Sequence, residues 1–392
     1  MEIIARQIKK LRKAYGYSQN RFGQAVGISQ RKVTDLENHK QKVSAELLIR
    51  IAKVFSIDID YFYNPEAQPH SADILFRAKE KMKDDDYKVL AALQRICYDL
   101  DVLEQTVKGK STKKIYRKYD IGLNRSMFEE AEEVALKERE YFELRMDPVV
   151  DIRSTLLRED VDLLEAALEY RISGFFFTLQ NGRPFLVVNS TLQPYSKNFS
   201  IAHEYAHLLL DCKESFNIIC KDLEKPQGEN VEKRANAFAA EFLLPSEVVE
   251  KSEPTRYNVV MLMNDFKVSR EVILNRWQRL GIITASLKAE LSGSKFQPSK
   301  VMMELGMENE FTAFLEKRPK RGTKKTPRKA SFSVHSLLPK KYIELAISAF
   351  KANRITYDKL SDYLYISPTE LETRLGIAPP RSTKYDSLVS KA

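Results

Sequence analysis

The stretch FSIAHEYAH, residues 199–207, carries two of the five histidines in this chain of 392 residues. Residues four apart lie on one face of a helix, so His203 and His207 can point both imidazoles at a single ion. Glu204 stands beside that face. Two histidines so placed bind zinc, and a glutamate between them activates the attacking water. The alternative is a buried helix whose two histidines are satisfied by hydrogen bonds, and these residues alone leave both interpretations open.

The stretch VEKRANAFAAEFLLP, residues 231–245, offers a third metal ligand. A catalytic zinc site has three protein ligands and one open position, and Glu232 is the candidate for the third ligand. Apolar residues recur at helical spacing here and predict a second helix that ends before Pro245. Asn236, one turn after Glu232, can hydrogen-bond to a metal ligand from behind. An exposed first-turn glutamate, favoured by the helix dipole, is the alternative for Glu232.

Two strands are predicted upstream, FFFTL at residues 175–179 and PFLVVN at residues 184–189. The second strand precedes the histidine helix by a short loop, and Ser200 is the expected cap of that helix. An edge strand beside such a helix can pair with an extended peptide and present its carbonyl to the metal. Glu204 would then take a proton from water and pass it to the leaving amine. The constellation therefore suits metal-assisted peptide hydrolysis.

The amino-terminal residues, 1 to about 65, predict a small helical domain. Ser18 and Ser29 are the expected caps of two short helices, and Gly27 supplies the tight turn between them. Two short helices joined by a glycine-containing turn form a helix-turn-helix, whose second helix lies in the major groove of DNA. A plain helical interaction module is the alternative.

The polar residues of these two helices fit DNA recognition. Glutamine and arginine carry the paired hydrogen-bonding groups that read adenine and guanine edges, and the start of a helix can meet a phosphate. Residues 1–65 hold 12 Lys and Arg against 6 Asp and Glu, a balance of +6. The residues predicted from this pattern to contact DNA are Gln19, Gln30, Arg31, Lys32 and Asp35.

Residues 67–150 are highly charged and helical in pattern, and apolar residues recur among them at steps of four and three. This heptad-like seam consists of Val89, Leu93, Ile96, Leu100, Leu103 and Val107. The helix that carries it either packs on its own domain or pairs with a second copy. Fewer than three heptads do not separate the two.

Three further stretches have helical or basic character. The run KRPKRGTKKTPRK, residues 317–329, predicts an exposed linker, with a nonspecific phosphate contact as the alternative. The stretch 266–283 reads like a short helix-turn-helix in which Trp277 and Leu280 are expected to pack inward. The stretch 354–377 has a similar helix-turn-helix-like pattern of apolar residues, and we expect it to bind DNA or a partner protein. Its expected core residues are Leu360, Leu364, Ile366, Leu371 and Leu375.

Composition favours a cytoplasmic, polyanion-binding protein. The net charge is +10, which favours a polyanionic partner, although a basic balance alone is weak support. The three cysteines have no CxxC spacing and fit free thiols in a reducing compartment. No stretch approaches the roughly 20 apolar residues that cross a bilayer, and the amino terminus lacks the pattern of a signal peptide.

Residues 3–62 resemble the Cro-type helix-turn-helix of the XRE family over essentially their whole length. The motifs SQxxF, GIS, and LEN followed by basic residues all stand at that family's spacings. His39 departs from the family, which usually has glycine after LEN, and a positive φ costs histidine more than glycine. The resemblance implies base-edge contacts from Ser29, Gln30, Arg31 and Asp35, and phosphate contacts from Gln19 and Lys40.

Residues 150 to about 285 resemble the ImmA/IrrE metallopeptidases, because FSIAHEYAHLLL and ExxANxFAAEFLLP match the family core in order and separation. That family often has a basic residue shortly before the zinc helix, and Lys197 is the candidate here. Its members cut, or trigger the loss of, DNA-bound repressors in phage, mobile-element and stress-response circuits. The resemblance implies a zincin-like fold with His203, His207 and Glu232 as zinc ligands and Glu204 as base.

We therefore expect a mainly α protein with a small β-sheet, an α+β fold in which DNA binding is joined to a zinc endopeptidase. The expected partners are operator DNA, a second copy of the chain and a protein substrate, most simply a repressor. One alternative is a transcription factor whose zinc domain is a sensor or catalytically silent, and another is an antitoxin-like or defence component. The predicted domains are 1–66 (helix-turn-helix), 67–150 (helical linker or dimerisation region), 151–290 (metallopeptidase), 291–335 (basic linker) and 336–392 (helical C-terminal domain).

Overall fold

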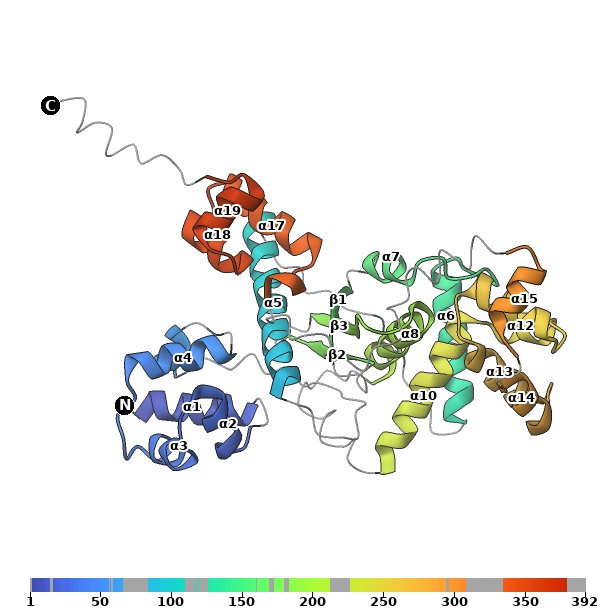
Figure 1. The fold of residues 1–392 in the computed structure, drawn as a ribbon, viewed down its shortest axis with the longest axis horizontal. Coiled ribbons are helices and arrows are strands. Elements are labelled where there is room, and N and C mark those ends of the chain that lie inside the picture. Colours follow the sequence, from blue (N-terminus) through green and yellow to red (C-terminus); the bar gives the residue numbers. More distant parts are fainter. Residues whose placement is uncertain are drawn as a thin grey trace. The chain divides into compact units, whose positions relative to one another are not determined.

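The chain forms two compact units in the computed structural model (Figure 1). The first, here the helical unit, consists of Met1–Ser71, Asp84–Lys113 and Pro327–Ala392. The second, here the sheet unit, consists of Ala72–Lys83 and Lys114–Thr326. The predicted fold class, mainly α with a small sheet, is confirmed. The structure describes residues 2–14, 17–55, 57, 59–65, 84–109, 117, 119, 126–159, 161–168, 173–179, 183–211, 226–293, 296–307 and 334–378.

The helical unit begins with α1 (Glu2–Ala14), α2 (Gln19–Val26), α3 (Gln30–Glu37), α4 (Ala45–Phe55) and the 3-10 helix η1 (Ile59–Phe62). Gly27 takes the left-handed conformation in the turn between α2 and α3, with φ 72°. The Ser29 hydroxyl then caps α3 by accepting a hydrogen bond from the Lys32 amide. His39 also has a positive φ, 61°, as its place after LEN predicts. The core that holds these helices together includes Phe22, Val26, Val33, Leu36 and Phe55.

The heptad-like seam lies on α5 (Asp84–Lys108), and α17 (Lys340–Lys351) packs against this helix. The Lys341 ammonium lies 2.8 Å from a Glu104 oxygen, and the Tyr342 hydroxyl lies 3.5 Å from Asp99 Oδ2. The buried residues of the seam are Val89, Leu93, Ile96, Leu100 and Leu103. These side chains are thus covered within the chain, as the packed-helix alternative expects.

The carboxyl-terminal helices are η2 (Val334–Leu337), α17, α18 (Tyr357–Leu364) and α19 (Pro368–Leu375). The turn between α18 and α19 has the same form as that between α2 and α3. Tyr365 is left-handed there with φ 54°, and Ser367 caps α19 in a capping box with Glu370. Leu375 is 38% exposed, contrary to expectation, because α19 ends at this residue. The other expected core residues, Leu360, Leu364, Ile366 and Leu371, are buried.

The three-stranded sheet has the order β1-β3-β2 and consists of β1 (Asp162–Ala166), β2 (Gly174–Thr178) and β3 (Pro184–Asn189). β3 pairs in parallel with β1 and antiparallel with β2. The two predicted strands are β2 and β3. The sequence of β1, DLLEA, escaped prediction because leucine, glutamate and alanine favour helices. β3 is the central strand, so the expectation of an edge strand at residues 184–189 is wrong, and β2 is an outer strand instead.

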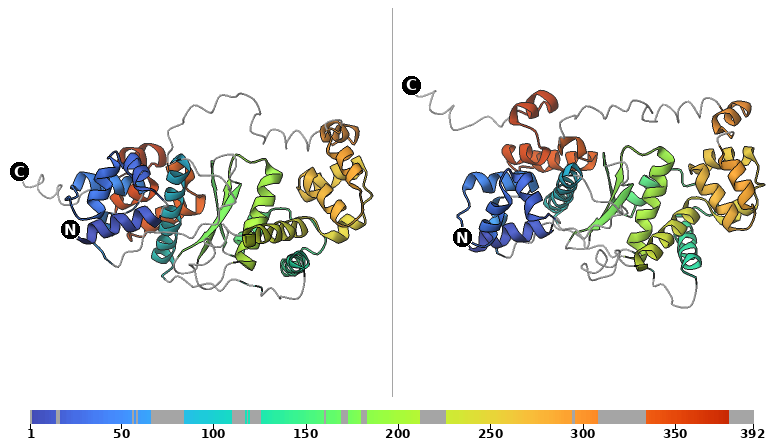
Figure 2. Two further views of the ribbon diagram at one scale, coloured as in Figure 1. Left: turned by 90° about the horizontal axis from the view of Figure 1, so that it is seen from below. Right: turned by 60° about the horizontal axis from the view of Figure 1, so that its bottom comes forward.

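Two helices carry the predicted metal ligands: α8 (Pro194–Leu210) and α10 (Pro226–Leu243). α8 packs against β2 and β3, as Figures 1 and 2 show, whereas α10 packs against α8 and α6 (Met127–Tyr141). Ser200 is not the cap of α8: the helix begins at Pro194, whose fixed φ suits the first helical position. Glu232 accordingly lies further inside α10 than a first-turn residue would.

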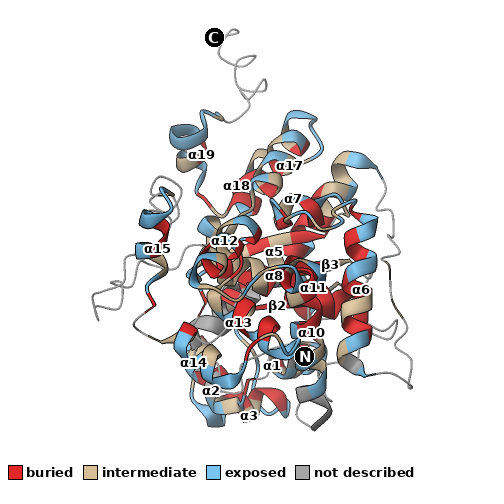
Figure 3. Ribbon diagram, turned by 90° about the vertical axis from the view of Figure 1, so that its right-hand side faces the viewer, coloured by how far each residue is buried: buried red, intermediate tan, exposed pale blue. Residues whose placement is uncertain are grey.

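The rest of the sheet unit is helical. Its further helices are α7 (Ile152–Leu157), α11 (Ser246–Glu250), α12 (Arg256–Phe266), α13 (Arg270–Arg279), α14 (Ala285–Ser292) and α15 (Pro298–Glu304). Helices α11 to α15 pack mainly against one another. Trp277 is fully buried, as expected, and its indole nitrogen donates to the Val249 carbonyl at 3.3 Å. Leu280 is 37% exposed, because it follows the last residue of α13. Buried residues, red in Figure 3, run through α8, α10 and α13. Within the described residues, no helix is long and apolar enough to span a membrane.

Candidate metal centre and DNA-binding face

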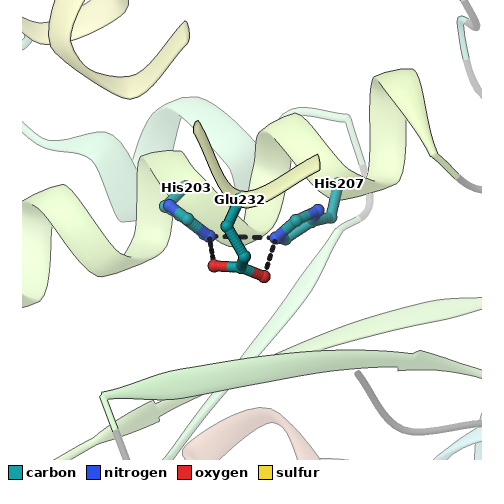
Figure 4. A group of neighbouring side chains, drawn as sticks. All are labelled: His203, His207 and Glu232. Atoms are coloured by element: carbon teal, nitrogen blue, oxygen red, sulfur yellow. Dashed lines mark hydrogen bonds and ion pairs between the residues drawn. The ribbon is translucent and has the colours of Figure 1, made fainter. Parts of the chain in front are cut away.

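The three predicted metal ligands meet between α8 and α10 (Figure 4). His203 Nε2 lies 3.2 Å from Glu232 Oε2, and His207 Nε2 lies 3.4 Å from Glu232 Oε1. The two imidazole Nε2 atoms are 2.9 Å apart. Each of the three residues therefore offers one donor atom to the same point, and these atoms all lie within 4.8 Å of one another.

The other nitrogen of each imidazole is held by an oxygen acceptor. His203 Nδ1 lies 2.9 Å from Asn236 Oδ1, the partner predicted for Asn236. His207 Nδ1 lies 2.7 Å from Asp211 Oδ2. An imidazole that donates its Nδ1 proton to such an oxygen has the Nε2 lone pair left for a metal ion, and both Nε2 atoms lie on the side of Glu232. Two such nitrogens and one carboxylate are a donor set that fits zinc and leaves a position open.

Two residues of this centre were not predicted from the sequence. Asp211 is buried at the end of α8 and holds His207, while Arg234 on α10 forms an ion pair with Asp211. Asp211 stands four residues after His207 and thus on the same face of the helix, a spacing that signals a second-layer carboxylate. Arg234 has no comparable signal, since only the packing of α10 on α8 brings it to Asp211.

The predicted base, Glu204, is buried on α8 close to the outer strand β2. A Cβ at Gly174 would lie 2.8 Å from the Val187 carbonyl oxygen and 3.5 Å from Glu204 Oε1. The Phe176 ring stacks on the His207 ring with centroids 6.0 Å apart. Gly174 and Phe176, alternate residues of β2, therefore face Glu204 and His207, and the Val187 carbonyl leaves no room for a side chain at position 174.

Lys197, the candidate basic residue, lies within the first turns of α8 instead of before the helix. Its ammonium is 2.8 Å from Glu165 Oε2 on β1. Burial alone would raise the pKa of the Glu165 carboxyl, but hydrogen bonds from Arg153 and Lys197 hold it below its usual value. Lys197 thus ties α8 to the sheet.

A buried polar cluster fixes α8 from the side of α6. The Tyr205 hydroxyl donates to Glu138 Oε2 at 2.6 Å, and Arg117 Nε donates to Glu138 Oε1 at 2.9 Å. Burial and the neighbouring Glu138 charge both raise the pKa of Tyr205 well above its ordinary value. The tyrosine therefore stays protonated, and its hydrogen bond to Glu138 links α8 to α6 between His203 and His207.

The predicted DNA-contacting residues lie at the surface around α3. The exposed ones are Ser29, Gln30, Arg31 and Lys40, and the partly exposed ones are Gln19, Lys32 and Asp35. All seven are therefore at least partly accessible to solvent. This exposure leaves their side chains accessible to a groove of DNA.

Gln19 differs from the others because its side chain is engaged inside the domain. Its amide nitrogen donates to Glu37 Oε2 at 3.0 Å, and the Thr34 hydroxyl donates to Gln19 Oε1 at 3.0 Å. Arg12 pairs with the same Glu37 from α1. Burial alone would raise the pKa of Glu37, but hydrogen bonds from Arg12 and Gln19 hold it below its usual value. These groups fix α3 against α1 and α2.

Comparison with known families agrees with both parts of this description. Residues 8–62 match the family model described as Helix-turn-helix. Residues 158–278 match the model described as IrrE N-terminal-like domain, and this range contains Glu204 and all three grouped ligands. No curated protein matches the chain. The chain is therefore a fusion of an XRE-type helix-turn-helix domain with an ImmA/IrrE-like peptidase-family domain, as the resemblance of its motifs predicted.

Proposed function

We propose that the protein is a DNA-binding regulator whose second domain is a zinc-dependent endopeptidase that cuts a regulatory protein, most simply a repressor. The observation that carries this proposal is the convergence of His203 Nε2 and His207 Nε2 on the Glu232 carboxylate, with Glu204 directly after His203 on α8. A site that only sensed zinc would not need a buried carboxylate at that position.

The roles of the residues follow from their positions. His203, His207 and Glu232 would hold zinc, which supplies Lewis-acid chemistry to a peptide carbonyl and to water. Glu204 would take the proton from water and give it to the leaving amine. The outer strand β2 has β3 on one side among the described strands, so its other edge can pair with an extended substrate. These are the requirements of peptide hydrolysis.

The helix-turn-helix would bring this activity to an operator. Ser29, Gln30, Arg31, Lys32 and Asp35 would meet base edges or phosphates in the major groove, with Lys40 at a phosphate. Gln19 would support α3, and its backbone amide at the start of α2 would face the phosphate. Paired half-sites would call for a homodimer.

The test compares new protein amino termini in cells that make wild type, Glu204→Gln or Glu250→Gln. Glu250 is an exposed glutamate on α11, so its variant controls for the substitution itself. Termini shared by wild type and Glu250→Gln but missing with Glu204→Gln would support proteolysis and name the substrate. Identical termini in all three, under resting and DNA-damaging conditions, would favour a regulator whose zinc domain is a sensor.

A further inference from the structure

A cavity of about 600 Å³ lies in the helical unit, where α17 ends and α18 begins. Its lining comes from residues 350–359, which form the last turn of α17, the connecting turn and the first turn of α18. The volume falls in the range of sites that enclose small ligands, about 300–1,000 Å³. None of the lining residues belongs to the metal centre or to the DNA-contacting set, so the cavity has no role in the proposed function.

The charged side chains of the lining are both cationic. They are Arg354 and Lys359, and no carboxylate lines the cavity. Arg354 donates to the Thr106 carbonyl in the last turn of α5, and the Lys359 ammonium lies 5.1 Å from the centroid of the Tyr363 ring. Neither cation is paired with a carboxylate among the residues that the structure describes. An anionic ligand would therefore meet two positive charges that are still available for charge-assisted hydrogen bonds.

Two aromatic rings form a wall of the same cavity. The rings of Phe350 and Tyr357 pack edge to face, with centroids 6.0 Å apart. The Tyr357 hydroxyl lies 2.9 Å from the Pro368 carbonyl oxygen and 3.1 Å from that of Ile377, so its ring is held in place. Fixed aromatic rings beside cations suit a ligand that joins a planar ring to an anion, because bases stack on aromatic side chains while phosphates bind arginine and lysine.

The helix that follows the cavity does not suit the groove of a duplex. Counted from the capping residues Ser29 and Ser367, the place of Lys32 on α3 is taken by Glu370 on α19. Glu372 is also exposed on α19. These carboxylates would repel the phosphates that line a groove. The cations at the start of α18 therefore suit a smaller anion than a DNA duplex.

The shape of the lining also disfavours a peptide. The cavity is built from two helix ends and a turn, and it offers no strand edge with which an extended backbone could pair. The backbone amide of Lys359 already donates to the Thr356 hydroxyl at 3.2 Å. A compact ligand that is recognised by its charge and its ring fits these observations better.

We propose that this cavity binds a nucleotide, with the phosphate between Arg354 and Lys359 and the base against Phe350 and Tyr357. A free nucleotide and a nucleotide of a single strand share this chemistry. The proposal goes beyond the proposed function and does not depend on it, since no lining residue takes part in zinc binding, proton transfer or operator contact.

The test measures ligand binding to the full chain by saturation-transfer NMR at one salt concentration. The probes are the 5′-monophosphates of adenosine, guanosine, cytidine and uridine, each compared with ribose 5-phosphate. At least one nucleotide should bind more tightly than ribose 5-phosphate, because only the nucleotide carries a base. Arg354→Gln and Lys359→Gln should each weaken binding of that nucleotide by about tenfold or more, the scale of a lost hydrogen bond to a charged group.

Phe350→Leu separates the base from the phosphate. It removes a ring but no charge, so it should weaken nucleotide binding and leave ribose 5-phosphate binding unchanged. Lys351→Gln is the matched control, because Lys351 is exposed at the end of α17 and lies outside the lining. Thermal unfolding confirms that each variant is folded.

The proposal is overturned if no nucleotide binds more tightly than ribose 5-phosphate, or if nucleotide binding is unchanged in both glutamine variants. It is also overturned if Lys359→Gln weakens only duplex DNA binding, or only the binding of an acetylated Asp-Phe-Asp peptide. The first of these results would assign the cations to a DNA backbone, and the second to a protein partner. A single-stranded oligothymidylate that displaces the nucleotide would support the site and identify a strand as its source, whereas nucleotide binding without such displacement would support a free nucleotide.

Discussion

At the scale of single residues, the metal centre depends on which nitrogen each imidazole leaves for the ion. Asn236 and Asp211 occupy the two Nδ1 atoms, so both Nε2 atoms turn to Glu232. Glu204 lies on α8 with the two histidines, but it is not one of the three grouped residues His203, His207 and Glu232. The two proposed roles, metal ligand and proton carrier, therefore fall on different residues and can be tested by separate substitutions.

Replacing Glu232 with alanine should lower bound zinc far more than replacing Glu204 with glutamine. The first change removes a donor atom, whereas the second keeps all three. Metal content after dialysis, measured by atomic emission on both variants and wild type, checks this. Zinc retained equally by wild type and Glu232→Ala would remove Glu232 from the site.

Asp211→Asn should weaken zinc binding by about 10–100-fold, the usual effect of losing the carboxylate behind a metal-binding histidine. The amide can present its NH₂ group to Nδ1, which disfavours the tautomer that binds metal. Competition with a chelator of known affinity gives the change, and Asp265→Asn, at an exposed position on α12, is the control. Unchanged affinity in Asp211→Asn would show that His207 is oriented without its help.

At the scale of elements, β2 and α3 are each held in place by close contacts at one point. β2 reaches Glu204 at Gly174, where any side chain meets the Val187 carbonyl. α3 is fixed on its inner side by the contacts of Glu37 with Gln19 and Arg12. The exposed side chains of α3 take no part in these contacts.

Gly174→Val should reduce stability by roughly 1–3 kcal/mol, as overpacking of a filled site does. Gly174→Ala should have a smaller effect, because it adds one carbon where valine adds three. Thermal unfolding of the two variants against wild type measures the order. If valine is tolerated as well as glycine, the Val187 carbonyl of β3 does not approach position 174 as closely as described.

Gln30→Ala and Arg31→Ala should each cost about 1–3 kcal/mol of specific DNA binding, the scale of a lost base contact. The operator is first selected from random duplexes by the wild-type chain, and affinities are then compared at one salt concentration. Gln24→Ala, on the exposed side of α2, and Arg6→Ala, on α1, are the matched controls. Operator affinity unchanged in the α3 variants would sink their assignment as base readers.

Residue spacing along a helix was the most informative part of the sequence. It predicted that His203, His207 and Glu232 share one place, because steps of four define a face and the second motif supplies the missing ligand. It did not predict β1, whose residues favour helices and become a strand only by pairing with β3. The ion pair between Asp211 and Arg234 likewise depends on how α10 packs on α8. Local sequence patterns do not predict that packing.

At the scale of the whole molecule, the helical unit is interrupted in sequence by the sheet unit. α5 comes before the peptidase-family domain and α17 comes after it, yet the two pack together. The domain boundaries predicted from sequence stay a proposal, as does the homodimer. What the packing establishes is that the described seam residues are covered within the chain.

Tyr342→Ala should destabilise the helical unit by roughly 3–5 kcal/mol, since it removes a fully buried ring. Tyr342→Phe keeps the ring and loses the hydroxyl that donates to the Tyr363 carbonyl at 3.0 Å, which should cost about 0.5–1.5 kcal/mol. Hydrogen exchange of α5 amides in the full chain reports both effects. Tyr257→Ala, at an exposed tyrosine of α12, should leave α5 protected. Equal protection in Tyr342→Ala and wild type would mean that α17 does not stabilise α5.

The pairing of α5 with α17 also sets an order of events during synthesis. α5 leaves the ribosome more than 200 residues before α17 does, an interval of roughly 10–50 s at an elongation rate of about 5–20 residues per second. Throughout that interval its apolar face lacks the cover that α17 gives it, while the nascent sheet unit can already fold. A chain that a premature stop cuts short before α17 would keep that surface without this cover. Such truncated products should therefore be recognised by chaperones or proteases even though their helix-turn-helix domain is intact.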